Sequence, residues 1–117
     1  MSWQELFEKW IDRLIPGWHV NLVADESIDA RADCCVLPAN RKATIRWRPD
    51  LPPSDRTACH EVCHCLAAHM QIAAENIADA LPEPAKIIAN DRIAHESEET
   101  AELLTDAFLK AYGETGI

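Results

Sequence analysis

The stretch His60-Glu61-Val62-Cys63-His64 decides how this chain is expected to fold, because two histidines stand four residues apart with a glutamate directly after the first. On an α-helix, residues i and i+4 lie one above the other on the same face. At about 100° per residue, His64 lies about 40° round the helix from His60, and Glu61 lies about 60° beyond His64. Both imidazoles can therefore reach one metal ion, and the carboxylate can act as a base on a metal-bound water.

The sequence around this motif has the signals of a helix that is capped at its start. A proline-rich connector at 49–53 is followed by Ser54, a good N-cap, and by Asp55, which is favourable in a first turn. We therefore predict a helix from 55 to about 70. Its side opposite the histidines carries apolar residues that are expected to seat the helix on the core, namely Val62 and Leu66 with Ala58 and Met70 flanking them.

The residues before the motif predict one helix and a small sheet. An amphipathic helix is expected over 3–14, where apolar residues recur every three or four positions and Ser2 can cap the start. Apolar and polar residues alternate at 18–24 and 43–48, and a short apolar stretch lies at 34–37, which together predict three strands. The last two are joined by a turn-forming Pro-Ala-Asn-Arg segment. We expect these strands to form a small antiparallel sheet.

The residues after the motif predict further helix. Residues 71–81 either continue the motif helix or form a second one, and two prolines then interrupt the pattern. A short helix is expected at 86–93, and a longer one at 97–112 that Gly113 ends. Together these elements predict an α+β fold in a single domain over 1–117, in the order helix, small sheet, motif helix and C-terminal helix.

A catalytic zinc site normally has a third protein ligand, and the chain offers several candidates downstream of the motif. His69 lies five residues beyond His64 and about 180° round the helix from His60, so it is expected to point away. The residues that remain after His69 is set aside are His95, Glu96, Glu98, Glu99 and Glu102.

Glu98 is the preferred third ligand because it continues the inward face of the last predicted helix. Stepping back three residues from Ala101 reaches Glu98, whereas Glu99 lies about 100° away and is the second choice. Glu102, four residues beyond Glu98, is placed to accept a hydrogen bond from a ligand histidine. The inward face itself is expected to be formed by Ala101, Leu104, Phe108 and Ala111.

The motif and the downstream glutamate together resemble the gluzincins, and the order of elements is similar to that of minimal gluzincins and ImmA/IrrE-type peptidase domains, which are common in phages and mobile elements. The downstream residues that carry the resemblance run Glu98-Glu99-Thr100-Ala101-Glu102-Leu103-Leu104. The resemblance implies a zincin-like fold and a zinc metallopeptidase acting on a peptide or protein. It implies one Zn²⁺ per chain held by His60, His64 and Glu98, with Glu61 as the general base.

A further donor is expected to stabilise the oxyanion that forms when a peptide carbonyl is attacked. We name His95 together with Glu61 as catalytic residues, and the alternative donors are Tyr112, His19 and Arg92. An extended peptide substrate is expected to add to the edge of the sheet near residues 43–48.

Composition and charge argue against several other classes of protein. Of the 117 residues, 48% are apolar, which is enough for a packed core. No apolar run approaches the ~20 residues that span a bilayer, and the start of the chain lacks the features of a signal peptide. We therefore expect a cytoplasmic protein with no membrane partner. A net charge of −9 argues against nucleic acid as a partner. The oligomeric state is left open.

Two alternatives accompany this interpretation. The five cysteines are odd in number and contain no CxxC pair, which favours reduced thiols in a core, but Cys59 or Cys63 could instead contribute to a cysteine-ligated zinc site. The alternative function is a non-enzymatic, zinc-stabilised acidic protein that occupies a basic site on a host protein.

Overall fold

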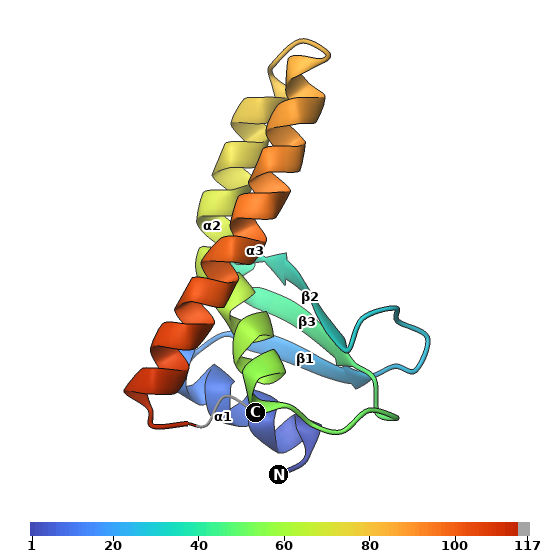
Figure 1. Ribbon diagram of the computed structural model, residues 1–117, viewed down its shortest axis with the longest axis vertical. Coiled ribbons are helices and arrows are strands. Elements are labelled where there is room, and N and C mark those ends of the chain that lie inside the picture. The colour runs from blue at the N-terminus through green and yellow to red at the C-terminus, as the bar shows by residue number, and fades with distance from the viewer. Residues whose placement is uncertain (115–117) are drawn as a thin grey trace.

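Residues 1–114 are described by the computed structural model, and they form three helices and one three-stranded sheet (Figure 1). The α+β class is therefore confirmed. In chain order the elements are α1 (Trp3–Leu14), β1 (His19–Ala24), β2 (Ala32–Leu37), the short 3₁₀-helix η1 (Pro38–Asn40), β3 (Lys42–Trp47), α2 (Asp55–Asp79) and α3 (Ala85–Ala111). No helix among the described residues has the length and apolar character needed to cross a membrane.

The sheet is mixed, so the prediction of an antiparallel sheet is wrong. The strand order is β1-β3-β2. β2 and β3 are antiparallel, with Cys34 opposite Ile45, whereas β1 runs parallel to β3, with Leu22 opposite Ile45. Two reversals of the chain separate β1 from β3, so these strands point the same way. β3 takes the central place, and its three inward side chains are all buried, namely Ala43, Ile45 and Trp47.

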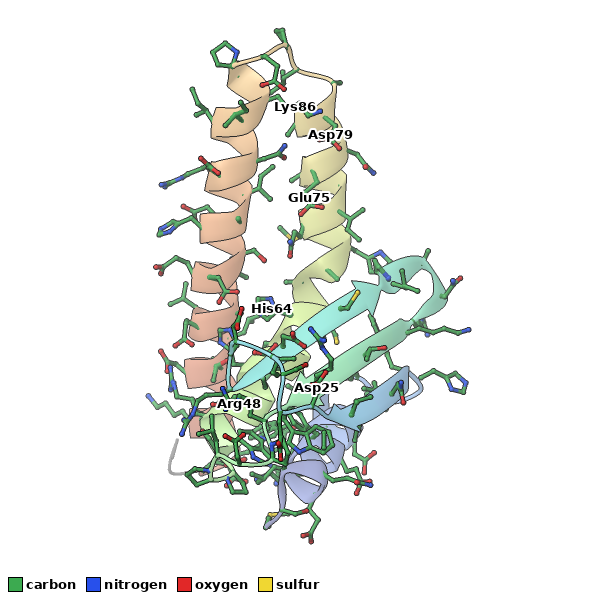
Figure 2. The ribbon with its side chains drawn as sticks, turned by 90° about the vertical axis from the view of Figure 1, so that its right-hand side faces the viewer. Asp25, Arg48, His64, Glu75, Asp79 and Lys86 are labelled. Atoms are coloured by element: carbon green, nitrogen blue, oxygen red, sulfur yellow. The ribbon has the colours of Figure 1, made fainter. Side chains whose placement is uncertain are left out.

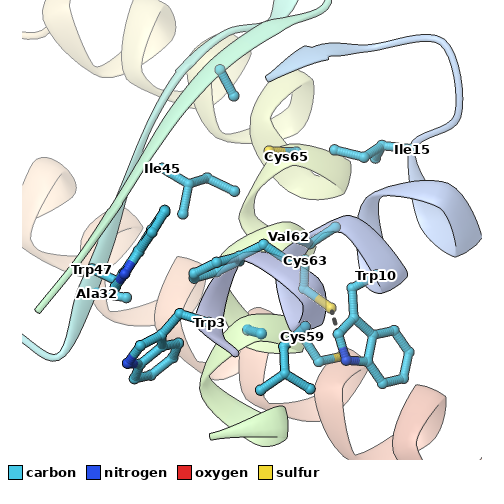
Figure 3. Close-up of a cluster of buried hydrophobic side chains, with 14 of the residues drawn as sticks. Trp3, Trp10, Ile15, Ala32, Ile45, Trp47, Cys59, Val62, Cys63 and Cys65 are labelled. Carbon is cyan, nitrogen blue, oxygen red and sulfur yellow. Dashed lines mark hydrogen bonds between the residues drawn. The ribbon is translucent and has the colours of Figure 1, made fainter. Parts of the chain in front are cut away.

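The hydrophobic core lies between one face of the sheet and the helices α1 and α2 (Figure 3). The rings of Phe7 and Trp47 have centroids 5.5 Å apart and join α1 to β3. Val62 contributes the fully buried aliphatic side chain of α2. The remaining inward positions of α2 carry small residues that allow close packing, and these are Ala58, Cys59, Cys63 and Cys65.

Helix α1 is tied to the start of α2 by hydrogen bonds from two indoles. The indole nitrogen of Trp10 donates to Oδ1 of Asp55 at 2.7 Å, and that of Trp3 donates to the carbonyl of Leu51 at 3.0 Å. Each tryptophan thus buries its ring while its N–H has a partner, as buried indoles require. Because Asp55 is the first residue of α2, these contacts fix where the motif helix begins.

α2 and α3 form one long antiparallel hairpin that extends past the sheet (Figure 1). Residues 71–79 therefore continue the motif helix. The helices predicted at 86–93 and 97–112 are a single helix of 27 residues. Figure 2 shows Glu75 and Asp79 of α2 lying beside α3 in the part beyond the sheet. Lys86 at the start of α3 pairs with Asp79 at 4.0 Å.

Some of the predictions of which residues pack in the core are wrong. Leu66 and Met70 are 41% and 81% exposed, so they do not seat α2 on the sheet. The buried residues there are Cys65 and Ala68, because the sheet contacts a neighbouring face of the helix. On α3, Ala101 is buried as predicted, but Ala111 is exposed. Apolar character alone did not identify the inward stripe, since the stripe that contacts the sheet carries small residues, whereas Leu66 and Met70 are exposed.

Candidate metal centre

His60, Glu61 and His64 are presented by the first half of α2, beside strand β2. The helix starts at the N-cap Ser54, whose hydroxyl accepts a hydrogen bond from the Thr57 backbone N–H at 3.1 Å. The opposite side of the helix is anchored in the core by Val62. Because Val62 faces the core, the rotation of α2 about its axis directs the two histidines toward α3.

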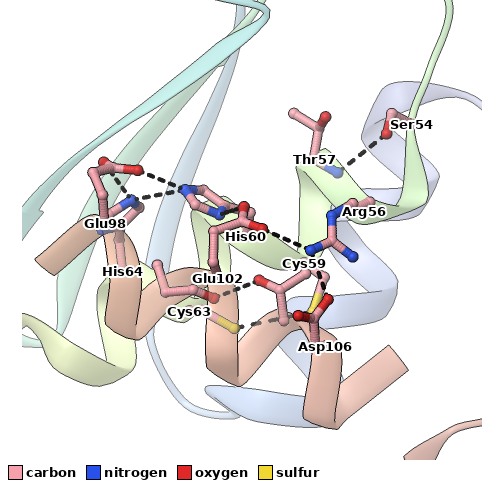
Figure 4. A network of polar contacts seen from close by, with 12 residues as sticks. Ser54, Arg56, Thr57, Cys59, His60, Cys63, His64, Glu98, Glu102 and Asp106 are labelled. Carbon is pink, nitrogen blue, oxygen red and sulfur yellow. Dashed lines mark hydrogen bonds and ion pairs between the residues drawn. The ribbon is translucent and has the colours of Figure 1, made fainter. Parts of the chain in front are cut away.

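The two histidines converge with Glu98 of α3 (Figure 4). Nε2 of His60 lies 3.1 Å from Oε2 of Glu98, and Nε2 of His64 lies 3.2 Å from Oε1 of the same carboxylate. The two Nε2 atoms are 3.2 Å apart. All three residues offer a ligand atom within 4.8 Å of the others, so the group could hold a metal ion.

The chemistry of these donors fits a bound cation. A neutral imidazole has one protonated nitrogen and one lone pair. Burial lowers the pKa of His64, which therefore carries a neutral ring at neutral pH. Two imidazole nitrogens and a carboxylate directed at the same point bring lone pairs together, and a cation between them relieves that repulsion. Two histidines and one glutamate, with a position left for water, form a ligand set typical of catalytic zinc.

Glu102 supports His60 from the other side of its ring. Oε1 of Glu102 lies 2.8 Å from Nδ1 of His60, a buried nitrogen with no other polar partner among the residues that the structure describes. Arg56 holds the pKa of Glu102 below its ordinary value, so the carboxylate is ionised. An ionised acceptor at Nδ1 favours the tautomer that leaves Nε2 free to bind a metal.

Glu61 lies at the wall of a cleft next to the three possible ligands. Its side chain is mostly buried, at 8% exposure. Burial, with a further contribution from the negative charge of Glu98, raises the pKa of Glu61 to about 8. A carboxyl group with a pKa near neutrality can both accept and donate a proton under physiological conditions.

The cleft has a volume of about 720 Å³ and lies between β2, α2 and α3. Its lining includes His60, Glu61, His64 and Glu98, and one wall is formed by residues 32–36 of β2. β2 is an edge strand, whereas β3 is the central strand. The prediction that a peptide adds near residues 43–48 is therefore wrong, because those residues lie on β3, and the edge beside the cleft belongs to β2.

The other predicted site residues lie outside this cluster. His95 does not line the cleft, and its side chain is 61% exposed with Nε2 at 3.9 Å from Glu99. Glu96 pairs with Arg92 at 2.7 Å and does not line the cleft. His69 is exposed, as expected. The alternative donors His19 and Tyr112 are also absent from the cleft lining, and Tyr112 packs its ring against Trp10.

The cysteines are free thiols and do not join the candidate metal centre. Cys59 and Cys63 are fully buried on the core side of α2, with their sulfurs 4.0 Å apart. Sequence reasoning missed Arg56, which pairs with both Glu102 and Asp106 beside the centre, and it missed Asp106 itself. The sequence feature that could have identified them is their spacing. Arg56 lies four residues before His60, and Asp106 lies eight residues after Glu98, so each lies on the same helical face as a predicted ligand.

Comparison with protein-family models, with curated proteins and with solved structures finds no significant match to this chain.

Proposed function

We propose that the protein is a zinc-dependent metallopeptidase of the gluzincin kind. The observation that carries the proposal is the convergence of His60, His64 and Glu98 beside a buried glutamate in an open cleft. His60, His64 and Glu98 would hold one Zn²⁺ per chain. A zinc ion bound there would polarise the carbonyl of a peptide and would make water easier to deprotonate near neutral pH.

The protein groups have separate roles in this proposal. The Glu61 carboxylate takes a proton from water in the cleft and holds it at Oε for transfer to the leaving amine. Its burial favours the protonated state that forms during this transfer, as the raised pKa indicates. Glu102 orients the ring of His60. The place of Glu61 within the cleft wall keeps this proton exchange close to any bound peptide.

The proposed substrate is an extended peptide segment that pairs with β2. An edge strand has unpaired backbone groups that can accept a further strand. Residues 32–36 of β2 line the same cleft as Glu61 and Glu98, so a peptide paired with this edge would pass beside both. Free thiols at all five cysteines support our placing the protein in a reducing compartment, which we propose is the cytoplasm.

The test combines metal analysis with one conservative substitution. The purified protein should contain about one zinc per chain, and it should cleave members of a peptide library. Glu61→Gln should keep the zinc and lose cleavage, because the amide keeps the shape of the side chain but cannot take up the proton. Glu75→Gln is the matched control, since Glu75 also lies on α2 and lines the cleft but is far from the histidines. Its cleavage activity should remain.

The results would separate the two functions considered. A protein that contains no zinc would contradict the proposed metal centre. A protein that holds zinc, cuts no peptide and still binds a basic host protein would support the non-enzymatic alternative. Equal loss of cleavage in Glu61→Gln and Glu75→Gln would show that the assay reports general damage to the cleft and would remove the case for Glu61 as the base.

A further inference from the structure

Two matched rows of side chains face each other across the α2–α3 hairpin (Figure 4). On α2 the row consists of residues four apart, and on α3 the partner row has the same spacing. Because the helices are antiparallel, the first member of one row meets the last member of the other. The α2 row is Arg56, His60 and His64, and the α3 row is Glu98, Glu102 and Asp106.

Arg56 occupies the end of this arrangement that is away from the metal ligands. Its Nη2 lies 2.6 Å from Oε2 of Glu102 and 2.6 Å from Oδ1 of Asp106. The other oxygen of Glu102 lies 2.8 Å from Nδ1 of His60. Glu102 is thus shared, with one oxygen directed at the arginine and the other at a candidate metal ligand.

This sharing limits the orientation of the Glu102 carboxylate. Without the guanidinium, Glu98, Glu102 and Asp106 would form a row of negative charges four residues apart, and such pairs repel one another. The Glu102 side chain is 48% exposed, so little packing would hold it against His60. A charged, directional contact from Arg56 supplies the restraint that packing does not.

We propose that Arg56 is a positioning residue for the metal centre, acting through Glu102 to hold the His60 ring in its ligand orientation. The inference rests on the proposed function only in requiring that His60, His64 and Glu98 bind zinc. It assigns Arg56 no contact with substrate.

Zinc affinity of the whole protein, measured by competition with a chelator, tests this proposal. Arg56→Ala is expected to weaken zinc binding about tenfold, the lower end of the range found when an outer-shell partner of a metal ligand is removed. Glu102→Ala should weaken it by a similar factor. If Arg56 acts through Glu102, the double variant should be no weaker than Glu102→Ala alone, because the two changes remove the same restraint.

Two further variants separate positioning from general stabilisation. Arg48→Ala is the matched control, because Arg48 pairs with Asp50 at 2.7 Å with similar exposure but away from the centre. Its zinc affinity should equal that of the wild type. Arg56→Lys keeps the charge and should recover part of the affinity. The melting temperatures of all metal-free variants should stay close to that of the wild type, since exposed ion pairs contribute little to folding.

Three outcomes would overturn the inference. Unchanged zinc affinity in Arg56→Ala, with zinc bound by the wild type, would refute the role of Arg56 and leave the proposed function standing. Losses that multiply in the double variant would show that Arg56 acts independently of Glu102. A wild-type protein without zinc affinity would refute both this inference and the proposed metallopeptidase.

Discussion

Nε2 of His60 lies 3.1 Å from Oε2 of Glu98, although the two residues are 38 positions apart in the sequence. The contact exists because α2 and α3 pair as an antiparallel hairpin and because both residues lie on the facing sides of their helices. Neither residue is held by a loop. The candidate metal centre therefore has the rigidity of two packed helices, which suits a site whose ligands must keep a fixed geometry.

Glu98→Ala should remove bound zinc, whereas Glu99→Ala should leave it in place. The two glutamates are adjacent, but only the Glu98 carboxylate faces His60 and His64, while Glu99 lies beside His95 on the outside of α3. Metal content of the purified variants, measured by elemental analysis, checks the assignment. The reverse pattern would make Glu99 the ligand and would require a different rotation of α3.

Glu61→Gln should make the metal-free protein more stable than the wild type as the pH rises from about 6.5 to 8. The pKa of Glu61 is about 8 in the folded protein and 4.5 as its ordinary value, so in this range the folded state holds a proton that the unfolded state has lost. Wild-type stability should therefore fall relative to the variant by roughly 1 kcal/mol per pH unit, and the difference should level off above pH 8.

Urea unfolding in the presence of a chelator measures this difference at each pH. His64 does not disturb the comparison, because the same histidine is present in the wild type and in the variant, so its contribution cancels in the difference. Ile87→Val serves as the control, because it changes no ionisable group and its stability relative to the wild type should not vary with pH. A flat difference for Glu61→Gln would mean that Glu61 is ionised in the folded protein.

Ile45→Val should lower the free energy of unfolding by about 1 kcal/mol, as expected when one methylene group is removed from a packed core. Ile45 is fully buried at the centre of β3. Ile87→Val is the matched control, since Ile87 is 58% exposed on α3 and should change stability little. Urea unfolding followed by circular dichroism compares the two. Equal effects would contradict the assignment of β3 to the core.

Ser54→Ala should destabilise the protein by about 1 kcal/mol, because the Thr57 backbone N–H would lose its side-chain acceptor at the start of α2. Ser54→Asp restores an acceptor at the same position and should recover most of the loss. Thermal unfolding of the two variants measures the effect. Equal destabilisation by alanine and aspartate would show that the cap contributes less than the burial of Ser54.

Short-range patterns predicted much of the fold. The apolar spacing and the Ser2 cap of α1 were confirmed over Trp3–Leu14, and the alternation at 43–48 identified the strand that became the centre of the sheet. The errors concern long-range choices. Whether β1 pairs with β2 or β3 depends on which strand buries the most apolar surface, and the exposure of Met70 depends on where the sheet ends beneath α2.

The sequence by itself determined that His60 and His64 share one face of the motif helix, because residues four apart lie one above the other. It also pointed to Glu98 through helical periodicity, although the expected buried position is wrong, because Glu98 faces α2 with its side chain 65% exposed. Only the tertiary structure decided that β2 borders the cleft, that His95 lies away from it and that Arg56 reaches Glu102. Periodicity describes one helix at a time, whereas the contacts between helices depend on their packing register, which the whole core sets.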